Sequence, residues 1–450
     1  MEEKPAEEPA QKPADQVVPE KPKETSKPTF EEQIPKYPPV QYVAPPPTNG
    51  TIGLTNFDFR GEYIGWPLGR VCAETKVTEG LYFECDNNSG GIGNIRNFIL
   101  TCIRYAIEAG ADGIVMPRIQ QRNQEQLGAL FTADFKPFDY FFDDKHFRAS
   151  MKKYCPRMQI LNKLEDVPRF EAIKQIKEFY PKELIHGGTT GDGCDERGIN
   201  RHLDMFRPSF DEFVKTKHHW PNLAAPVSVR FRWATFFEWP VYRDGPEFAT
   251  TFGDLLRIRP DIEEIAARTV EALVKAIHNT TEKIDRKNLD APYLGIHLRT
   301  EADSLGFWPN FEQQALGYLE QAGTRGLKHG YIATGNATEG HRFGQLALDH
   351  VGMKVYGKTD LLQDEALENL NRLTWDQQAL VDFLVLTKSA HFTGCSFSSF
   401  SMNIAVKRHT MIDGLRTRHW RSPGDVYSTL VGRFENWFGD WMFMLECMWP

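Results

Sequence analysis

Three short segments, far apart in the sequence, contain residue types that could together hold a phosphate-bearing ligand. The first is rich in glycine and contains Gly90, Gly91, Gly93, Asn94 and Arg96. Glycine lets backbone N–H groups approach an anion closely, and the start of a following helix favours negative charge. The asparagine could cap that helix or bond a ligand. A glycine-rich turn is also often only a tight turn, so the segment alone leaves both interpretations open.

The second segment contains His297, Arg299 and Asp303 at the end of an apolar run, 293–298. Alternation along a strand places His297 and Arg299 on the same face. A guanidinium offers paired donors to phosphate oxygens, so Arg299 could clamp a diphosphate. His297 could bond a ribose hydroxyl or brace the arginine, and Asp303 could hold Arg299 or act on the substrate. The alternative is a buried histidine beside a surface Arg–Asp pair.

The third segment, 393–401, contains Ser398, Ser399 and Phe400 between an expected strand and an expected helix. Small hydroxyl residues and free N–H groups at a helix start can form an anion-binding nest. The alternative is a serine-rich helix cap without a ligand.

Strands that alternate with helices would position these segments. Residues 81–85, 94–109 and 113–116 are expected to form a strand, a helix and a second strand, which is the repeating unit of a parallel sheet. Further strands are expected at 227–233, 293–298, 330–334, 353–356 and 391–394, and further helices at 261–283, 311–322, 340–350, 375–389 and from 398 onward. The stretch 120–220 is expected to add only helices and loops. Ligands bind beyond the carboxyl ends of such strands, which here means loops 86–94, 299–310 and 394–400.

The chain of 450 residues is predicted to be an α/β protein with two facing Rossmann-like domains, 51–258 and 259–450. Residues 1–50 contain 12 of the 28 prolines and few large apolar residues, so a disordered tail or stem is expected. The net charge of −8 argues against a nucleic-acid partner. No apolar run is long enough to span a membrane, and no signal peptide is found at Met1.

The seven cysteines are dispersed, without a zinc-binding pattern: Cys72, Cys85, Cys102, Cys155, Cys194, Cys395 and Cys447. They could be buried apolar residues, or they could form one to three disulfides in a secretory compartment with at least one thiol left over.

In order and spacing, the three segments resemble the O-fucosyltransferase superfamily over about residues 80–410. That family's glycine loop matches Gly90, Gly91, Asn94 and Arg96, with Ile95 in place of a usual glutamine. The family's His-x-Arg-x-x-x-Asp pattern is matched without a gap. A late Asp-bearing helix followed by a Ser-(Ser/Thr)-Phe-Ser segment matches Asp382 and 391–401.

The resemblance implies a metal-independent, inverting glycosyltransferase of the GT-B fold that uses GDP-fucose and needs no cofactor. It implies that Arg299 is catalytic, binding the diphosphate and helping the leaving group depart, that Ser398, Ser399 and Phe400 hold phosphate oxygens and line the nucleotide site, and that Asn94 and His297 contact donor sugar or ribose. The N-terminal domain would face a protein or glycan acceptor, and the C-terminal domain would hold the nucleotide sugar. The location implied is the ER or Golgi lumen, behind a type II membrane anchor preceding this chain, or the cytoplasm if the chain is complete as given.

Two departures from the family pattern bear on catalysis. Some members carry a glutamate base in the glycine loop, where this chain has Gly91. The acid of the family's Ala-Thr-Asp strand end is replaced by Gly335, which affects how guanine is read. Glu301, Asp303 and Asp86 are the candidate substitutes for the base. A catalytically impaired nucleotide-sugar-binding protein and a transferase of another nucleotide sugar therefore remain alternatives.

Weaker signals are interpreted as structural. Glycosylation sequons begin at Asn49, Asn279 and Asn336. The adjacent His218 and His219 are expected in a surface loop without a metal. The aromatic residues of 437–449 are expected to pack as an amphipathic closing helix.

Overall fold

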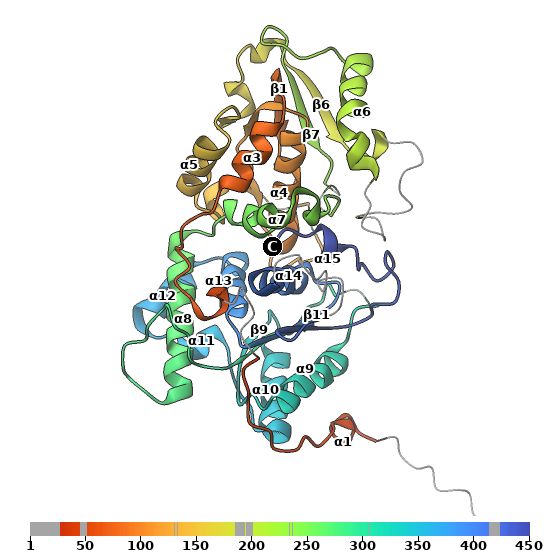
Figure 1. Ribbon diagram of the computed structural model, residues 1–450. Coiled ribbons are helices and arrows are strands. Elements are labelled where there is room, and N and C mark those ends of the chain that lie inside the picture. Colours follow the sequence, from red (N-terminus) through yellow and green to blue (C-terminus); the bar gives the residue numbers. More distant parts are fainter. Residues whose placement is uncertain are drawn as a thin grey trace, which may run out of the picture. The chain divides into compact units, whose positions relative to one another are not determined.

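The computed structural model describes residues 28–45, 52–129, 131–132, 134–184, 194, 201–233, 235, 237–304, 306–413 and 424–450 (Figure 1). The chain divides into two units, Met1–Pro35 and Lys36–Pro450. The first unit contains the short helix α1 (Phe30–Gln33). Most of the expected disordered segment, the loop 187–193 and the sequon at Asn49 lie outside the described residues. The domain boundaries at 50 and 258 stay a prediction.

A first parallel sheet forms from the N-terminal half of the larger unit. In the described residues its strand order is β5-β2-β1-β7-β6. The strands are β1 (Thr78–Glu84), β2 (Ala111–Val115), β5 (Gln159–Leu161), β6 (Lys174–Phe179) and β7 (Val227–Phe231). Its helices are α3 (Trp66–Glu74), α4 (Ile92–Glu108), α5 (Asp144–Tyr154), α6 (Arg201–Lys217) and α7 (Pro246–Thr251), whereas the short helix α2 (Ile52–Thr55) contacts α14 (Ser399–Asp413) of the second sheet region. An antiparallel pair, β3 (Ile119–Gln120) and β4 (Phe135–Lys136), follows β2.

A second parallel sheet follows, with the order β10-β9-β8-β11-β12 in the described residues. The strands are β8 (Leu294–His297), β9 (His329–Ala333), β10 (Lys354–Tyr356), β11 (His391–Cys395) and β12 (Ser428–Val431). Its helices are α8 (Pro260–His278), α9 (Phe311–Arg325), α10 (Ala337–Val351), α11 (Lys358–Leu361), α12 (Asp364–Arg372), α13 (Trp375–Thr387), α14 (Ser399–Asp413) and α15 (Met444–Cys447). Numbered from β8, the strand order is 3-2-1-4-5, which is that of a Rossmann fold.

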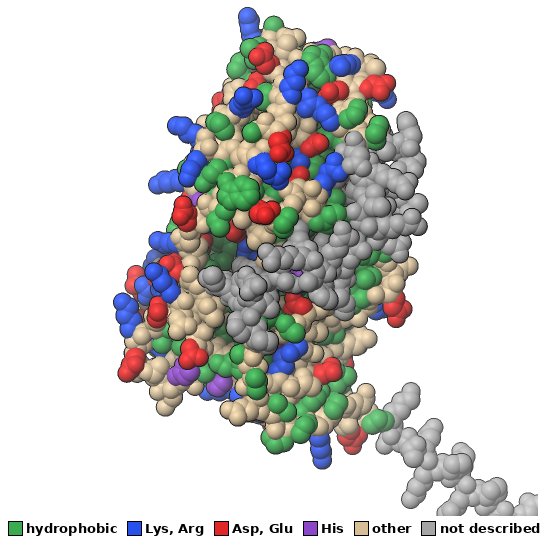
Figure 2. Space-filling model, in the orientation of Figure 1, with side chains coloured by type: hydrophobic (Ala, Val, Ile, Leu, Met, Phe, Trp, Pro, Cys, Tyr) green, Lys and Arg blue, Asp and Glu red, His purple; other side chains and the backbone are tan. Residues whose placement is uncertain are grey.

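The apolar core continues from one sheet region into the other. Helices α13 and α14 contact strands of the second sheet and also α4 of the first. In Figure 1, α9 and α10 lie together on the side of the second sheet that faces away from α13 and α14. The predicted α/β class with two Rossmann-like, GT-B-type sheets is therefore confirmed. On the face drawn in Figure 2, basic and acidic side chains are interspersed.

Several boundaries differ from the sequence predictions. The stretch 120–220 was expected to hold only helices and loops, yet β5 and β6 form both edges of the first sheet. The edge strand β12 was also missed. Helix α8 ends at His278 because Asn279 adopts a left-handed conformation, φ 49°, which stops the helix before 283. The prediction of an amphipathic closing helix over 437–449 is wrong, since residues 437–443 form turns and α15 is only four residues long.

Six cysteines are paired. Cys72–Cys155 joins α3 to the end of α5, Cys85–Cys102 joins the end of β1 to α4, and Cys194–Cys447 joins residue 194 to α15. Cys395 is a buried free thiol in β11. None of the helices in the described ranges combines the length and apolar composition needed to cross a lipid bilayer.

Candidate donor-binding site

A cavity of about 410 Å³ lies where loops of the two sheets meet, a volume within the usual range for small-molecule sites. Nine of the predicted site residues line it: Gly90, Gly91, Asn94, His297, Arg299, Asp303, Ser398, Ser399 and Phe400. Three segments distant in sequence therefore converge on one space. Gly93, Arg96 and Asp86 are not among the lining residues.

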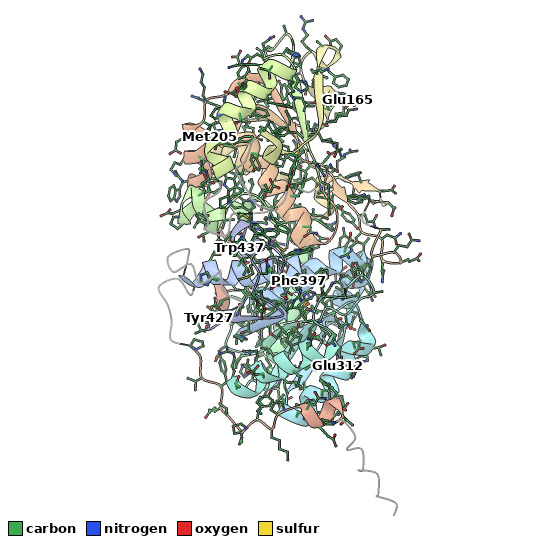
Figure 3. The ribbon with its side chains drawn as sticks, turned by 90° about the vertical axis from the view of Figure 1, so that its right-hand side faces the viewer. Glu165, Met205, Glu312, Phe397, Tyr427 and Trp437 are labelled. Atoms are coloured by element: carbon green, nitrogen blue, oxygen red, sulfur yellow. A yellow bond between two sulfur atoms is a disulfide. The ribbon has the colours of Figure 1, made fainter. Side chains whose placement is uncertain are left out.

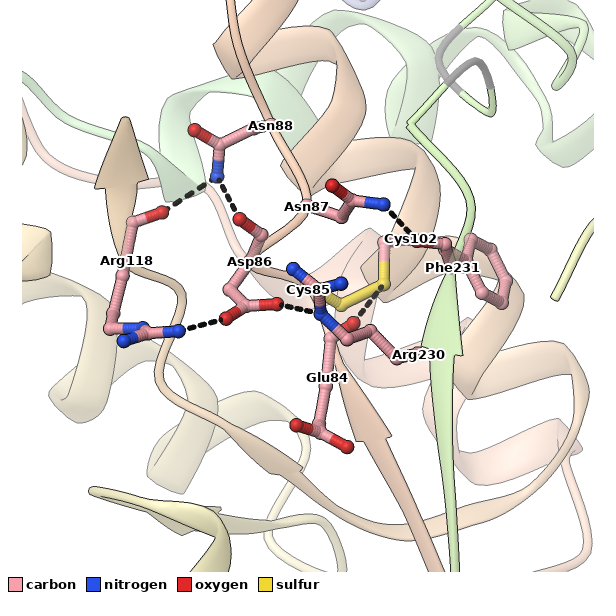
Figure 4. Close-up of a disulfide and its surroundings, with 9 residues drawn as sticks. All are labelled: Glu84, Cys85, Asp86, Asn87, Asn88, Cys102, Arg118, Arg230 and Phe231. Atoms are coloured by element: carbon pink, nitrogen blue, oxygen red, sulfur yellow. Dashed lines mark hydrogen bonds and ion pairs between the residues drawn. A yellow bond between two sulfur atoms is a disulfide. The ribbon is translucent and has the colours of Figure 1, made fainter. Parts of the chain in front are cut away.

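The glycine loop is held rigidly between β1 and α4. The disulfide Cys85–Cys102 ties the end of the strand to the helix, and Asp86 pairs with Arg118 and Arg230 at 2.7 Å each (Figure 4). Gly90 has φ +93°, a conformation that side chains disfavour. The pairing of Asp86 with two arginines outside the cavity removes it as a candidate base.

Gly93 supports the site by close packing. A Cβ built at Gly93 would lie 2.7 Å from the backbone carbonyl of Ser399. Only a residue without a side chain lets α4 approach the start of α14 this closely. The glycine loop and the serine turn are therefore in direct contact.

Arg299 follows β8 and is held by two acids. Its Nη1 donates to Glu301 and its Nη2 to Asp303, both at 2.5 Å, and its guanidinium lies 5.5 Å from the ring centre of Trp308. Burial alone would lower the pKa of Arg299, but the two carboxylates raise it above its ordinary value. The guanidinium is therefore charged and fixed in position.

Asp303 joins Arg299 to a residue that sequence reasoning missed. Its Oδ1 accepts from Arg299, and its Oδ2 accepts from Arg122 Nη2 at 2.5 Å. Arg122 comes from the loop after β3, in the first sheet region. With both oxygens engaged by guanidinium groups, Asp303 is suited to positioning the arginines and poorly suited to accepting a proton.

The other lining carboxylates also accept hydrogen bonds through both of their oxygens. Glu301 also accepts from the backbone N–H of Gly335 at 2.6 Å. Asp376 accepts from Tyr140 at 2.7 Å through Oδ1 and from the Arg122 backbone N–H at 3.1 Å through Oδ2.

Asp382 accepts from Tyr331 at 2.6 Å and from Lys358 at 2.7 Å. Among the described lining residues, each of the four carboxylates thus has both oxygens hydrogen-bonded.

His297 lies beneath the serine turn. Its Nδ1 is 2.6 Å from Ser401 Oγ, and its ring centre is 4.6 Å from that of Phe400. Burial lowers the pKa of His297 to about 4, so the ring is neutral near pH 7. A neutral imidazole here can hydrogen-bond a ligand without adding charge.

The serine turn presents the start of α14 to the cavity. Phe397 has φ +67°, and the Ser398 carbonyl accepts the N–H of Met402 at 2.9 Å. The first amides of a helix have no partner within the helix, so they can bind an anion. Phe397, at the junction of the two regions in Figure 3, contacts Trp441 edge to face, with ring centres 5.8 Å apart. Trp441 lines the cavity, although the C-terminal aromatics were expected only to pack.

Arg96 does not take the ligand-binding position that was predicted for it. The buried guanidinium donates to the backbone oxygens of Trp449, at 2.7 Å, and Pro450. Burial lowers its pKa to about 10. Its place on α4 directs it toward the C-terminal segment and away from the cavity.

Lys358, Trp308 and Trp375 also line the cavity and were not predicted. Lys358 directly follows the predicted strand 353–356, so the rule that ligands bind at carboxyl ends of strands could have found it. No sequence pattern marked Arg122, because β3 is only two residues long.

The adjacent histidines and two of the sequon asparagines have local structural surroundings. His219 Nε2 lies 3.0 Å from the Ala225 carbonyl, and within the described ranges no cluster of three metal-ligating side chains is found. The side chain of Asn336 caps α10, accepting from Glu339 N–H at 3.2 Å. Asn279 is exposed at the end of α8.

Two Rossmann-like sheets with an arginine and a helix start at a shared cavity are features that a nucleotide-sugar glycosyltransferase needs in order to hold its donor. The family of GDP-fucose protein O-fucosyltransferases matches residues 81–307, just over half of the chain. The chain belongs to this family and is a glycosyltransferase.

Comparison with solved structures finds matches at low identity. POFUT1 in complex with GDP-fucose is 14% identical, with 80% of this chain and 100% of that chain covered and a TM-score of 0.46. NodZ α-1,6-fucosyltransferase soaked with GDP-fucose is 14% identical, with 74% and 92% covered and a TM-score of 0.35. A mutant of Arabidopsis thaliana FUT1 in complex with GDP is 10% identical, with 76% and 71% covered and a TM-score of 0.37. No curated protein sequence matches the chain.

Proposed function

We propose that the chain transfers fucose from GDP-fucose to a hydroxyl group of a protein Ser or Thr or of a glycan, with inversion and without a metal. One observation carries the proposal: the glycine loop, Arg299 and the serine turn line the same cavity. The family match supports GDP-fucose as the donor.

In this proposal the second sheet region binds the leaving nucleotide. Arg299 and the first amides of α14 bind the diphosphate, while Asn94 and His297 contact donor sugar or ribose. The acceptor oxygen attacks the anomeric carbon as the bond to the diphosphate oxygen breaks, so negative charge builds up on GDP, and the hydroxyl proton passes to a departing phosphate oxygen or to solvent. A fixed guanidinium and oriented N–H groups stabilise that charge without reorganising.

The same assignment extends to the two predicted domains. Arg299 and the serine turn both come from 259–450, which supports this part as the nucleotide-sugar side. The remaining part, 51–258, contributes Trp233 and the glycine loop to the cavity and would face the acceptor.

Calorimetric binding of GDP, GDP-fucose, UDP and ADP tests the donor assignment. GDP and GDP-fucose should bind more tightly than UDP or ADP. Arg299→Ala should weaken GDP binding by at least 100-fold, because paired hydrogen bonds to a charged group are lost. Arg372→Gln, which removes an arginine 74% exposed on α12, is the matched control and should bind normally. Equal binding of all three nucleoside diphosphates, or normal GDP binding by Arg299→Ala, would reject the assignment.

Metal independence is tested separately by measuring transfer after exhaustive chelation with EDTA. Unchanged turnover is expected, since the positive charge in this proposal is supplied by arginine. A loss of turnover that Mg²⁺ or Mn²⁺ restores would contradict it.

A second candidate function is nucleotide-sugar binding without transfer. It is favoured by the engagement of all four described lining carboxylates, which leaves none of them free to take the acceptor proton. Release of fucose from GDP-fucose in the absence of acceptor distinguishes the two, because a transferase should hydrolyse its donor slowly. No release, with donor binding intact, would favour the binding protein.

For location we propose the lumen of the secretory pathway. Three disulfides support an oxidising compartment. Mass spectrometry of the chain purified from its native cells should find these pairs and a glycan at the exposed Asn279. Free thiols at all six positions would place the protein elsewhere. The membrane anchor remains a prediction.

A further inference from the structure

Arg122 reaches the donor cavity from the opposite sheet region to Arg299. Its side chain is 15% exposed, and its Nη2 donates to Asp303 at 2.5 Å. Its backbone N–H donates to Asp376, and its guanidinium lies 5.6 Å from the ring centre of Trp375. Both the backbone and the head group are therefore held in place at the cavity wall.

The guanidinium has an unused donor. Its Nε is buried and has no hydrogen-bond partner among the described residues. Burial lowers the pKa of Arg122 and the nearby Arg299 lowers it further, although Asp303 acts in the opposite direction. A buried donor left without a partner is costly, and a charged one more so. The Arg122 guanidinium is therefore short of one hydrogen bond, although it lies in the wall of the cavity.

The glycine loop leaves room for this head group. A Cβ built at Gly91 would lie 3.5 Å from Arg122 Nη1, which is ordinary contact distance. Any longer side chain at position 91 would meet the guanidinium. Gly91 is also the N-cap residue that precedes α4, so Arg122 lies beside a helix start.

Asp303 holds the two arginines as a pair. One oxygen of Asp303 bonds Arg299 and the other bonds Arg122, so the two guanidinium groups lie on either side of one carboxylate. Both guanidinium groups line the donor cavity and bring positive charge to it. Two spaced guanidinium groups suit a diphosphate, whose two phosphates offer separate sets of acceptor oxygens.

We propose that Arg122 is a second diphosphate-binding residue, which holds the phosphates of the nucleotide from the first sheet region while Arg299 holds them from the second. This inference rests on the proposed function. It makes donor binding depend on both sheet regions and adds a second positive group to stabilise the departing diphosphate.

The test compares GDP, measured by calorimetry, with guanosine, measured by saturation-transfer NMR. Arg122→Gln should weaken GDP binding by 10- to 100-fold and change guanosine binding by less than twofold. Arg122→Lys keeps the charge but loses the Nε donor and should recover part of the GDP affinity. Arg372→Gln is again the control for loss of one arginine charge, and thermal melting checks that each variant is folded.

The outcomes separate this inference from the proposed function. A wild-type chain that does not bind GDP would contradict both. Suppose that the wild-type chain binds GDP, that Arg299→Ala loses this binding, and that Arg122→Gln binds GDP within twofold of wild type. That result would overturn the role of Arg122 alone. Equal weakening of GDP and guanosine would also overturn it, since that pattern indicates a purely structural role. If Arg122→Gln does not fold, Arg122→Lys takes its place in the test. A lower ratio of GDP affinity to guanosine affinity than in the wild type would support the role of Arg122, and an unchanged ratio would overturn it.

Discussion

The two sheet regions build their shares of the cavity in different ways. In the second region Arg299 and the serine turn directly follow β8 and β11, neighbouring strands of a regular 3-2-1-4-5 sheet. In the first region the glycine loop follows β1 and Trp233 follows β7, whereas Arg122 comes from a loop after the two-residue strand β3, outside the main sheet. In the second region the cavity residues are positioned by the ends of strands. In the first region the glycine loop and Arg122 are positioned by ion pairs and a disulfide.

The same contrast applies to stability. The first region carries the disulfides Cys72–Cys155 and Cys85–Cys102, while the second contains the free thiol of Cys395. The second region is held instead by Arg408, whose fully buried guanidinium donates to the carbonyls of Thr387, Ser389 and Tyr427. Two internal covalent links thus add to the buried polar contacts of the first region, such as Arg104 with Asp244 at 2.7 Å, whereas the second region relies on buried polar contacts such as those of Arg408. Four predictions test this comparison, in order of decreasing effect.

Removing the longest link within the first region should have the largest effect. The double variant Cys72→Ala/Cys155→Ala opens a loop of 83 residues, which corresponds to about 4–5 kcal/mol in chain entropy. Urea unfolding measures the loss, and hydrogen exchange should place it in the first region. Cys395→Ala is the control, with an expected cost of about 1 kcal/mol. Similar losses in both variants would contradict the comparison.

Replacing the buried arginine should be nearly as costly in the second region. Arg408→Met leaves three buried carbonyl groups without their donor, and we expect a loss of about 3–4 kcal/mol in unfolding free energy. Hydrogen exchange in β12 should rise first, because Arg408 also donates to Ser428 Oγ at 3.1 Å. Arg372→Met at the exposed position on α12 should cost less than 0.5 kcal/mol. A neutral effect of Arg408→Met would show that packing alone holds this edge strand.

Acid should destabilise the second region through His297. Burial lowers its pKa to about 4, so between pH 6.5 and 4 the unfolded chain binds a proton that the folded chain excludes. Stability is complete above the unfolded pKa and falls by up to about 3 kcal/mol as the pH drops toward 4. His297→Asn should flatten the pH dependence of urea unfolding, whereas His341→Asn, at an exposed position on α10, should leave it unchanged. An unchanged slope in His297→Asn would show that this ring is not the group responsible.

Adding one methyl group where the two regions touch should have the smallest effect. In Gly93→Ala the new Cβ would meet the Ser399 backbone at 2.7 Å, so α4 and α14 must separate slightly. We expect GDP affinity to fall about 5- to 10-fold, or about 1 kcal/mol, by calorimetry. Gly344→Ala in α10, where the nearest atom would be 3.9 Å away, is the matched control and should bind GDP normally. Equal affinities in the two variants would mean that this contact does not shape the site.

Strands with continuous apolar character could be predicted from the sequence. The central strands β1, β2, β7, β8, β9 and β11 were all predicted, because a strand covered on both faces tends to be apolar throughout. Of the four edge strands, β10 was predicted, whereas β5, β6 and β12 were missed. Lys174–Phe179, for example, has only Ile176 and Phe179 buried, so it shows neither an apolar run nor strict alternation, and its pairing with β7 makes it a strand.

The sequence by itself determined the α/β class, the central strands and the residues that directly follow them, since periodicity and chain order are local properties. Arg299, Asn94 and the serines were found for that reason. Tertiary structure alone decided that Arg96 turns to the C-terminal segment, that Arg122 reaches Asp303 and that six cysteines pair. These contacts join residues separated by 17 to 353 positions, and such proximity depends on how the whole core packs rather than on any local pattern.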